Sequence, residues 1–179
     1  MKTTILALAI ASTFTSAAPA QSVGEKTGVN SVFGITPKTE DFIKEAAMSD
    51  MLEVDAAKIA QQKGDADEKK FAEAMITDHD KTSTELKGLV PSDMASAIPT
   101  SLDDSSQKKL DKLKNAKPND FASEYDPMQV DAHEDAVSLF ERYSKGGDNA
   151  KLKDWAGKTL PALQHHLQMA EQMNNNRSK

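Results

Sequence analysis

The sequence contains no cysteine, which excludes disulfide bonds and metal sites built on thiolates. Aromatic residues make up only 5% of the chain, and runs of β-branched residues are almost absent. Alanine, leucine, lysine, glutamate, aspartate and glutamine dominate instead, which favours helices over sheets. The fold must therefore be stabilised by packing between helices, because no covalent cross-link is available.

Familiar catalytic motifs are also missing. The chain has no Gly-x-Ser-x-Gly turn and no glycine-rich loop that would bind phosphate. Its net charge is -6 and no basic patch stands out, which argues against a nucleic-acid partner. These absences favour a non-enzymatic role. They leave a protein partner, a small ligand and an oligomeric state open.

Long hydrophobic runs are lacking as well. The longest apolar stretch, Ile5 to Ala11, is too short to span a bilayer. It follows the positive charge of Lys2 and precedes a small-x-small pattern ending at Ala20. This arrangement predicts a secretory signal peptide over residues 1–20 and a protein located in the periplasm or secreted, with no membrane span after cleavage. The alternative is an uncleaved membrane anchor.

The rest of the chain predicts one helical domain. Residues 21–38 read as a flexible lead, 39–174 as the domain and 175–179 as a disordered tail. Apolar residues at helical spacing predict long helices at 39–63, 66–89, from about 127 to 146, and 148–174, with a short helix at 102–115. Very short connections join the helices in pairs, which predicts two hairpins and an antiparallel four-helix bundle. The short helix lies in the crossover connection.

The start of the third long helix is ambiguous because of Pro127. A proline inside a helix costs about 3 kcal/mol. The favoured interpretation makes Asp126 the N-cap and Pro127 the first helical residue. The alternative is one continuous helix from Asp120 that is kinked at Pro127.

Four side chains are candidate metal ligands. His79, His133 and His166 come from three different helices, and Glu53 comes from the fourth. Three imidazoles and a carboxylate suit a divalent transition metal such as zinc, copper, nickel or iron. Asp78 or Glu141 would orient a ligand histidine from behind.

The alternative for each histidine is a structural role, with hydrogen bonds across the bundle. Depth also argues against a compact site. Counted from the hairpin turns, Glu53 and His79 differ by about 7 Å, and His133 and His166 differ by about 9 Å. His165 is expected to face solvent.

Several phrases of the chain resemble a known family. They are DFIKEAA at 41–47, FAEAMITDH at 71–79, QVDAH at 129–133 and TLPAL at 159–163. In this combination the chain, from about Thr39 to Met173, resembles the bacterial exported proteins of domain-of-unknown-function family 4142. The resemblance implies a ferritin-like bundle and export, but no activity.

Ferritin-like di-iron proteins use Glu-x-x-His motifs, and this chain has none. A standard di-iron site is therefore not expected. The leading hypothesis is a non-enzymatic binding or envelope-stress module. The alternatives are a metal-binding or redox protein with a His/Glu site inside the bundle, and a structural domain that presents acidic helix faces to a partner.

Overall fold

The computed structural model describes residues 29–177. Within this range every regular element is a helix, and the predicted all-helical class is confirmed. The elements are α2 (Val29–Val32), α3 (Thr39–Lys63), α4 (Ala66–Leu89), the 3-10 helix η1 (Ser92–Ala97), α5 (Asp104–Asn115), α6 (Phe121–Gly146) and α7 (Ala150–Arg177). The predicted signal peptide and the first part of the predicted lead lie outside the described residues.

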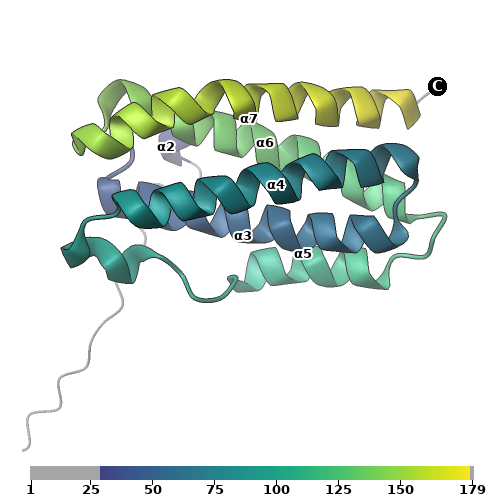
Figure 1. Ribbon diagram of the computed structural model, residues 1–179. Helices are drawn as coiled ribbons and strands as arrows, with labels where there is room; N and C mark the ends of the chain where they lie inside the picture. Colours follow the sequence, from purple (N-terminus) through teal and green to yellow (C-terminus); the bar gives the residue numbers. More distant parts are fainter. Residues whose placement is uncertain (1–28, 178–179) are drawn as a thin grey trace, which may run out of the picture.

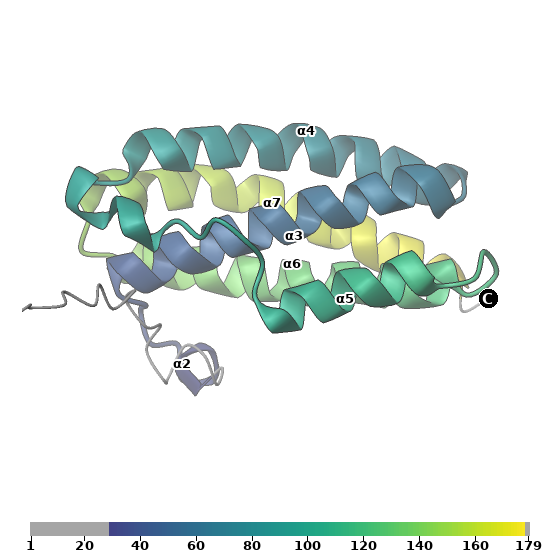
Figure 2. The same ribbon diagram turned by 90° about the horizontal axis from the view of Figure 1, so that it is seen from below.

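Four long helices, α3, α4, α6 and α7, lie side by side (Figure 1). Helices α3 and α4 form one hairpin, and α6 and α7 form the other. The connection between the hairpins contains η1 and α5, and α5 runs along α3 and α6 (Figure 2). The ends of α3 and α4 are those predicted from the sequence. Helix α5 begins two residues later than predicted, where Asp103 accepts the backbone N–H of Ser106 as N-cap.

The favoured start of the third long helix was wrong. Helix α6 begins at Phe121 and contains Pro127 in its interior, so the continuous alternative holds. Phe121 and Tyr125 are stacked with ring centroids 5.3 Å apart and are 1% and 0% exposed. Burying two such rings contributes about 1.5–3 kcal/mol each, which offsets the cost of about 3 kcal/mol for an internal proline.

The predicted tail is also different from the structure. Helix α7 does not end near Asn174 but continues to Arg177. The Arg177 guanidinium lies 2.7 Å from Asp65, 3.1 Å from Glu68 and 3.0 Å from Asp126. These carboxylates belong to the α3–α4 connection, α4 and α6. One residue therefore holds the end of α7 against the rest of the bundle.

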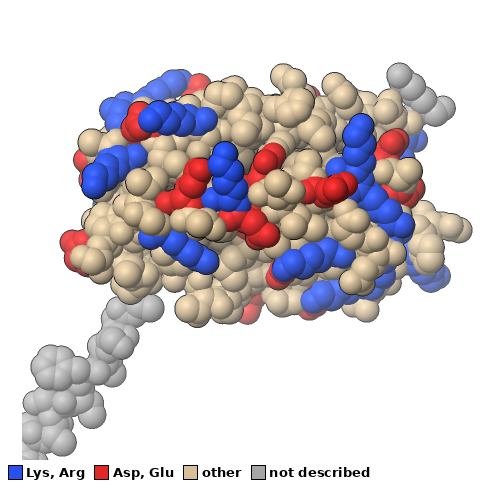
Figure 3. Space-filling view, viewed as in Figure 1, with Lys and Arg blue, Asp and Glu red and all other residues tan. Residues whose placement is uncertain are grey.

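Charges of both signs are mixed on the molecular surface. In the view of Figure 3, lysines and arginines alternate with aspartates and glutamates. Four of the ion pairs join residues three or four apart on one helix, a spacing that supports exposed helices. No helix between residues 29 and 177 has the length and apolar character to cross a membrane.

The apolar core is divided into two clusters. One contains Phe42, Phe140, Tyr143 and Trp155 with their neighbours. The other contains Phe71, Met75, Tyr125 and Met173 with theirs. On each long helix the change from one cluster to the other passes a buried polar residue: Asp50 on α3, His79 on α4, His133 on α6 and His166 on α7. A polar layer therefore crosses the middle of the bundle.

Replacing Arg177 with alanine should destabilise the protein by about 1–3 kcal/mol, because the buried Glu68 and Asp126 carboxylates lose their cationic partner. Lys158 on the same helix is the matched control, since its pair with Asp154 is exposed. Lys158→Ala should change the free energy of unfolding in urea by no more than about 0.5 kcal/mol. Equal effects of the two variants would contradict a structural role for Arg177.

Candidate metal centre

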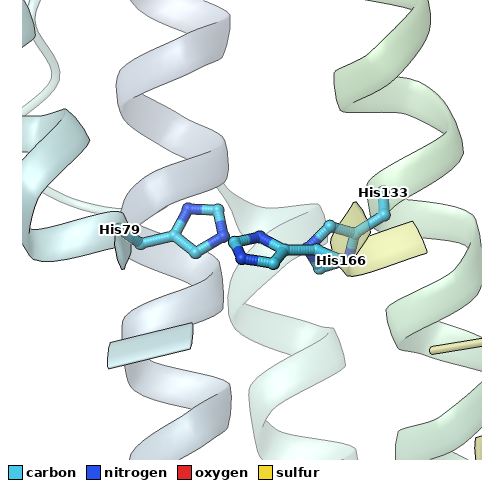
Figure 4. A group of neighbouring side chains, drawn as sticks. All are labelled: His79, His133 and His166. Atoms are coloured by element: carbon cyan, nitrogen blue, oxygen red, sulfur yellow. The ribbon is translucent and has the colours of Figure 1, made fainter. Parts of the chain in front are cut away.

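The polar layer brings together three histidines from three helices. His79, His133 and His166 are 2%, 1% and 3% exposed. Their ring centroids form a nearly equilateral triangle with sides of 5.8, 5.7 and 5.6 Å. Each ring offers one nitrogen such that the three nitrogens lie within 4.8 Å of one another. Figure 4 shows the three side chains reaching toward one point between their helices.

One nitrogen of each ring is held by a hydrogen bond. His79 Nδ1 donates to the Asp50 carboxylate at 2.8 Å. His133 Nδ1 donates to the backbone carbonyl of Gln129 at 2.8 Å, and His166 Nε2 donates to the Asp78 carboxylate at 2.9 Å. These bonds fix the orientation of each ring and, in the neutral form of the ring, leave the lone pair on the opposite nitrogen.

The other nitrogen of each ring is buried and unpaired. His79 Nε2, His133 Nε2 and His166 Nδ1 have no hydrogen-bond partner among the residues that the structure describes. Native proteins satisfy nearly all buried polar atoms, so such groups call for a specific explanation. Three of them, on rings that converge, are the arrangement that three metal-ligating imidazoles require.

Asp50 is the residue that sequence reasoning missed. Its carboxylate accepts hydrogen bonds from His79, from the Thr82 hydroxyl at 3.0 and 2.9 Å, and from the Ser83 hydroxyl at 3.0 Å. Asp50 and His79 each lie thirteen residues from the helix ends, Lys63 and Ala66, that flank the connection. The two are therefore level. The sequence did contain a pattern that could have identified Asp50, because this residue follows Ala46 by four residues on the same apolar stripe.

The depth argument was wrong for the histidines. It counted the residues of the turns as helical rise. Measured from the helix ends, His133 lies thirteen residues before Gly146 and His166 sixteen residues after Ala150. The difference of three residues is about 4.5 Å along the axis, a distance that imidazole side chains can cover. The three histidines therefore meet.

The inward face of α6 around His133 is complete only because the helix begins at Phe121 and not at Pro127. The full helix shows a stripe of Phe121, Tyr125, Gln129 and His133, at intervals of four residues, all buried. His133 therefore lies at the centre of the inward face.

Glu53, the fourth predicted ligand, is buried but does not belong to the group of ligand atoms within 4.8 Å. It lies three residues nearer the α3–α4 connection than Asp50, or about 4.5 Å along the helix. Burial raises the pKa of Glu53 to about 7, against the opposing effects of His79 and the Gln129 amide. Neither Glu53 oxygen completes a hydrogen bond of ordinary geometry with residues 29–177.

The two residues predicted to orient a ligand histidine have different partners. Asp78 does hydrogen-bond to His166, whereas Glu141 pairs with Lys145 at 2.5 Å near the surface. His165, next in sequence to His166, is exposed as expected.

The three histidines also differ in pKa. Burial, together with the charge of the neighbouring His79, lowers the pKa of His133 to about 4. Burial likewise lowers the pKa of His166 to about 4, although its bond to Asp78 opposes this effect. For His79, burial lowers the pKa, but the hydrogen bond and charge of Asp50 and the charge of Glu53 outweigh it and raise the pKa. At neutral pH two of the rings are therefore neutral, the form that binds metals.

Changing Glu53 to glutamine should stabilise the metal-free protein at high pH. The folded-state pKa of about 7 lies above the ordinary value of 4.5 for a glutamate, so the stability that Glu53 provides is present below pH 4.5 and is lost as the pH rises through 7. The loss corresponds to about 3 kcal/mol. Glu53→Gln should match the wild type in urea unfolding at pH 4.5 and exceed it at pH 8. A constant difference at both pH values would contradict a buried Glu53 carboxyl.

A family model described as "Domain of unknown function (DUF4142)" matches residues 24–173. Neither a search of curated proteins nor a search of solved structures found a match to the chain. The matched range contains all three histidines, together with Asp50, Glu53 and Asp78. The chain belongs to the DUF4142 family.

Proposed function

We propose that this protein is an exported, ferritin-like four-helix bundle that binds one divalent transition-metal ion through His79, His133 and His166. The observation that carries the proposal is the convergence of three rings, each with one nitrogen held and the other buried without a partner. The predicted signal peptide supports export to the periplasm. The pairing of α3 with α4 and of α6 with α7 supports a ferritin-like arrangement.

The proposed ligand set suits borderline ions. Three neutral imidazoles without thiolate fit zinc, copper(II), nickel or iron(II) better than calcium or magnesium, which prefer oxygen ligands. Bonds of about 2.0–2.1 Å to three nitrogens would place these nitrogens about 3.4 Å apart. In the structure the three nitrogens lie within 4.8 Å of one another. A small inward rotation of the rings would bring them to the spacing that a metal needs. The site differs from a ferritin di-iron centre, which needs carboxylates from all four helices.

The hydrogen bonds behind the rings favour a metal over a purely structural role. Metal-ligating histidines almost always donate their second N–H to a carboxylate or a backbone carbonyl. Two carboxylates and one carbonyl fill these positions here. A histidine with a structural role would use both ring nitrogens or expose one to water. Each of these histidines uses only one within residues 29–177.

A protein-binding role, which was the leading hypothesis from the sequence, is the second candidate. Val32, Phe33 and Ile35 are 82%, 74% and 49% exposed, and exposed apolar side chains that lie together often mark interaction sites. This role predicts that the triple alanine variant at these positions loses self-association or partner binding, measured by light scattering and cross-linking. Unchanged behaviour would remove this candidate.

Zinc binding tests the metal proposal. In isothermal titration calorimetry the metal-free protein should bind one equivalent of Zn²⁺. His79→Ala, His133→Ala and His166→Ala should each lower the affinity by more than roughly a hundredfold, because even the loss of a residue behind a ligand costs about 10–100-fold. His165→Ala is the matched control: His165 is adjacent to a ligand but exposed, and its loss should leave the affinity unchanged.

Two results would contradict the proposal. The first is a wild-type protein that takes up no stoichiometric Zn²⁺, Cu²⁺, Ni²⁺ or Fe²⁺. The second is an equal affinity in all four variants. Thermal unfolding of each variant without metal separates a lost ligand from a lost fold, because a correctly folded variant keeps one cooperative transition.

A further inference from the structure

A second set of unpaired polar atoms lies one helical turn from the histidines. Glu53 is 1% exposed and Gln129 is 0% exposed. The Gln129 side chain interacts with the Glu53 carboxyl, but neither oxygen of Glu53 and neither polar atom of the Gln129 amide completes a hydrogen bond of ordinary geometry within the described part of the chain. Four orphaned atoms in two fully buried side chains are unusual and indicate something that binds between them.

Glu53 and Gln129 lie on the same side of the three rings. Glu53 is nearer the α3–α4 connection than Asp50 is, and Gln129 precedes His133 by one turn toward the start of α6. The start of α6 and the α3–α4 connection share one end of the bundle, since Arg177 bridges Asp126 and Asp65 there. The charge on His79 and the Gln129 amide both act on Glu53. The two side chains therefore form a polar floor next to the candidate metal centre.

Glu53 and Gln129 are better placed to contact a ligand of the metal than to contact the metal itself. The Glu53 carboxylate lies outside the group of atoms within 4.8 Å, so it is not placed as a fourth ligand. A metal-bound water reaches further, because its oxygen lies about 2.1 Å from the ion and its hydrogen bond adds about 2.7 Å. A carboxylate about 4 Å from the ion can therefore accept that bond.

We propose that the metal held by the three histidines keeps a fourth position open to water, which a small anion can displace, and that the Glu53 carboxylate and the Gln129 amide oxygen accept hydrogen bonds from this water. The inference rests on the proposed metal binding and adds a property to it. Three protein ligands and a water are the arrangement of reactive metal sites, whereas structural sites fill all four positions with protein atoms. Glu53 and Gln129 are positioning residues in this scheme, because they act through the bound ligand.

Cobalt(II) and azide provide the test. Cobalt(II) replaces other divalent ions in such sites and has visible absorption bands that respond to its ligands. The cobalt-loaded wild type should change its spectrum saturably when azide is added, because azide displaces the bound water. A full equivalent of bound cobalt with a spectrum that azide does not alter would overturn the inference.

Glu53→Gln separates a positioning residue from a ligand. If Glu53 holds the water, the variant should bind cobalt within about tenfold of the wild type. It should bind azide at least about threefold more tightly, because a neutral amide oxygen accepts the hydrogen bond of the competing water more weakly than a carboxylate does and no longer repels the anion. A loss of cobalt affinity by more than about a hundredfold would show that Glu53 ligates the metal and would overturn the inference. Glu134→Gln, an exposed glutamate beside His133, is the control and should change neither affinity.

Gln129→Met gives an independent readout, since methionine keeps the length of the side chain and removes the amide. It should retain cobalt and shift the azide affinity, and an unchanged azide affinity in both floor variants would overturn the proposed floor. The two proposals fail differently. If the wild type binds no cobalt, both proposals are wrong. If the wild type binds cobalt, His166→Ala does not, and azide leaves the wild-type spectrum unchanged, only the open fourth position is wrong.

Discussion

The fold depends on burying a layer of ionisable groups between two apolar clusters. A charged or polar side chain in a helix bundle is costly unless hydrogen bonds satisfy it. Asp50 meets this condition by accepting bonds from His79, Thr82 and Ser83. Because these donors come from α4, the carboxylate also fixes α3 against α4 at one level. The position of His79, and through it the height of the whole layer, follows from this contact.

The other hydrogen bonds of the polar layer fix the histidines of α6 and α7. His166 on α7 donates to Asp78 on α4, which links the two hairpins across their interface. His133 is held within its own helix by the carbonyl of Gln129. The two apolar clusters then pack on either side, and Arg177 secures the end of the bundle beyond the second cluster. The helices are thus held in register by polar contacts and kept together by apolar ones.

The sequence predicted the helices well because each signal was local. Gly64 and Asp65 mark the α3–α4 turn, where Asp65 and Glu68 form a reciprocal cap. The start of α6 was predicted wrongly because the local cost of Pro127 is outweighed by the burial of Phe121 and Tyr125, which depends on partners in other helices. The three histidines were found because each stands on a different predicted helix. Asp50 was not found, because its role depends on the register between α3 and α4, which no single helix encodes.

The energy of the metal-free layer argues for a ligand. Three histidine nitrogens are buried without partners among residues 29–177, and the Glu53 carboxyl and the Gln129 amide complete no hydrogen bond of ordinary geometry there. Each such atom costs about 1–3 kcal/mol, whereas a typical domain is stable by only about 5–15 kcal/mol. A structural layer would be more stable with leucines at these positions, and a bundle of this length does not need polar residues to fold. A metal with a bound water would satisfy the three nitrogens and offer the floor a hydrogen-bonding partner at once. The free energy that destabilises the metal-free protein would then contribute to the affinity for the ion. The fold would be more stable with metal than without it.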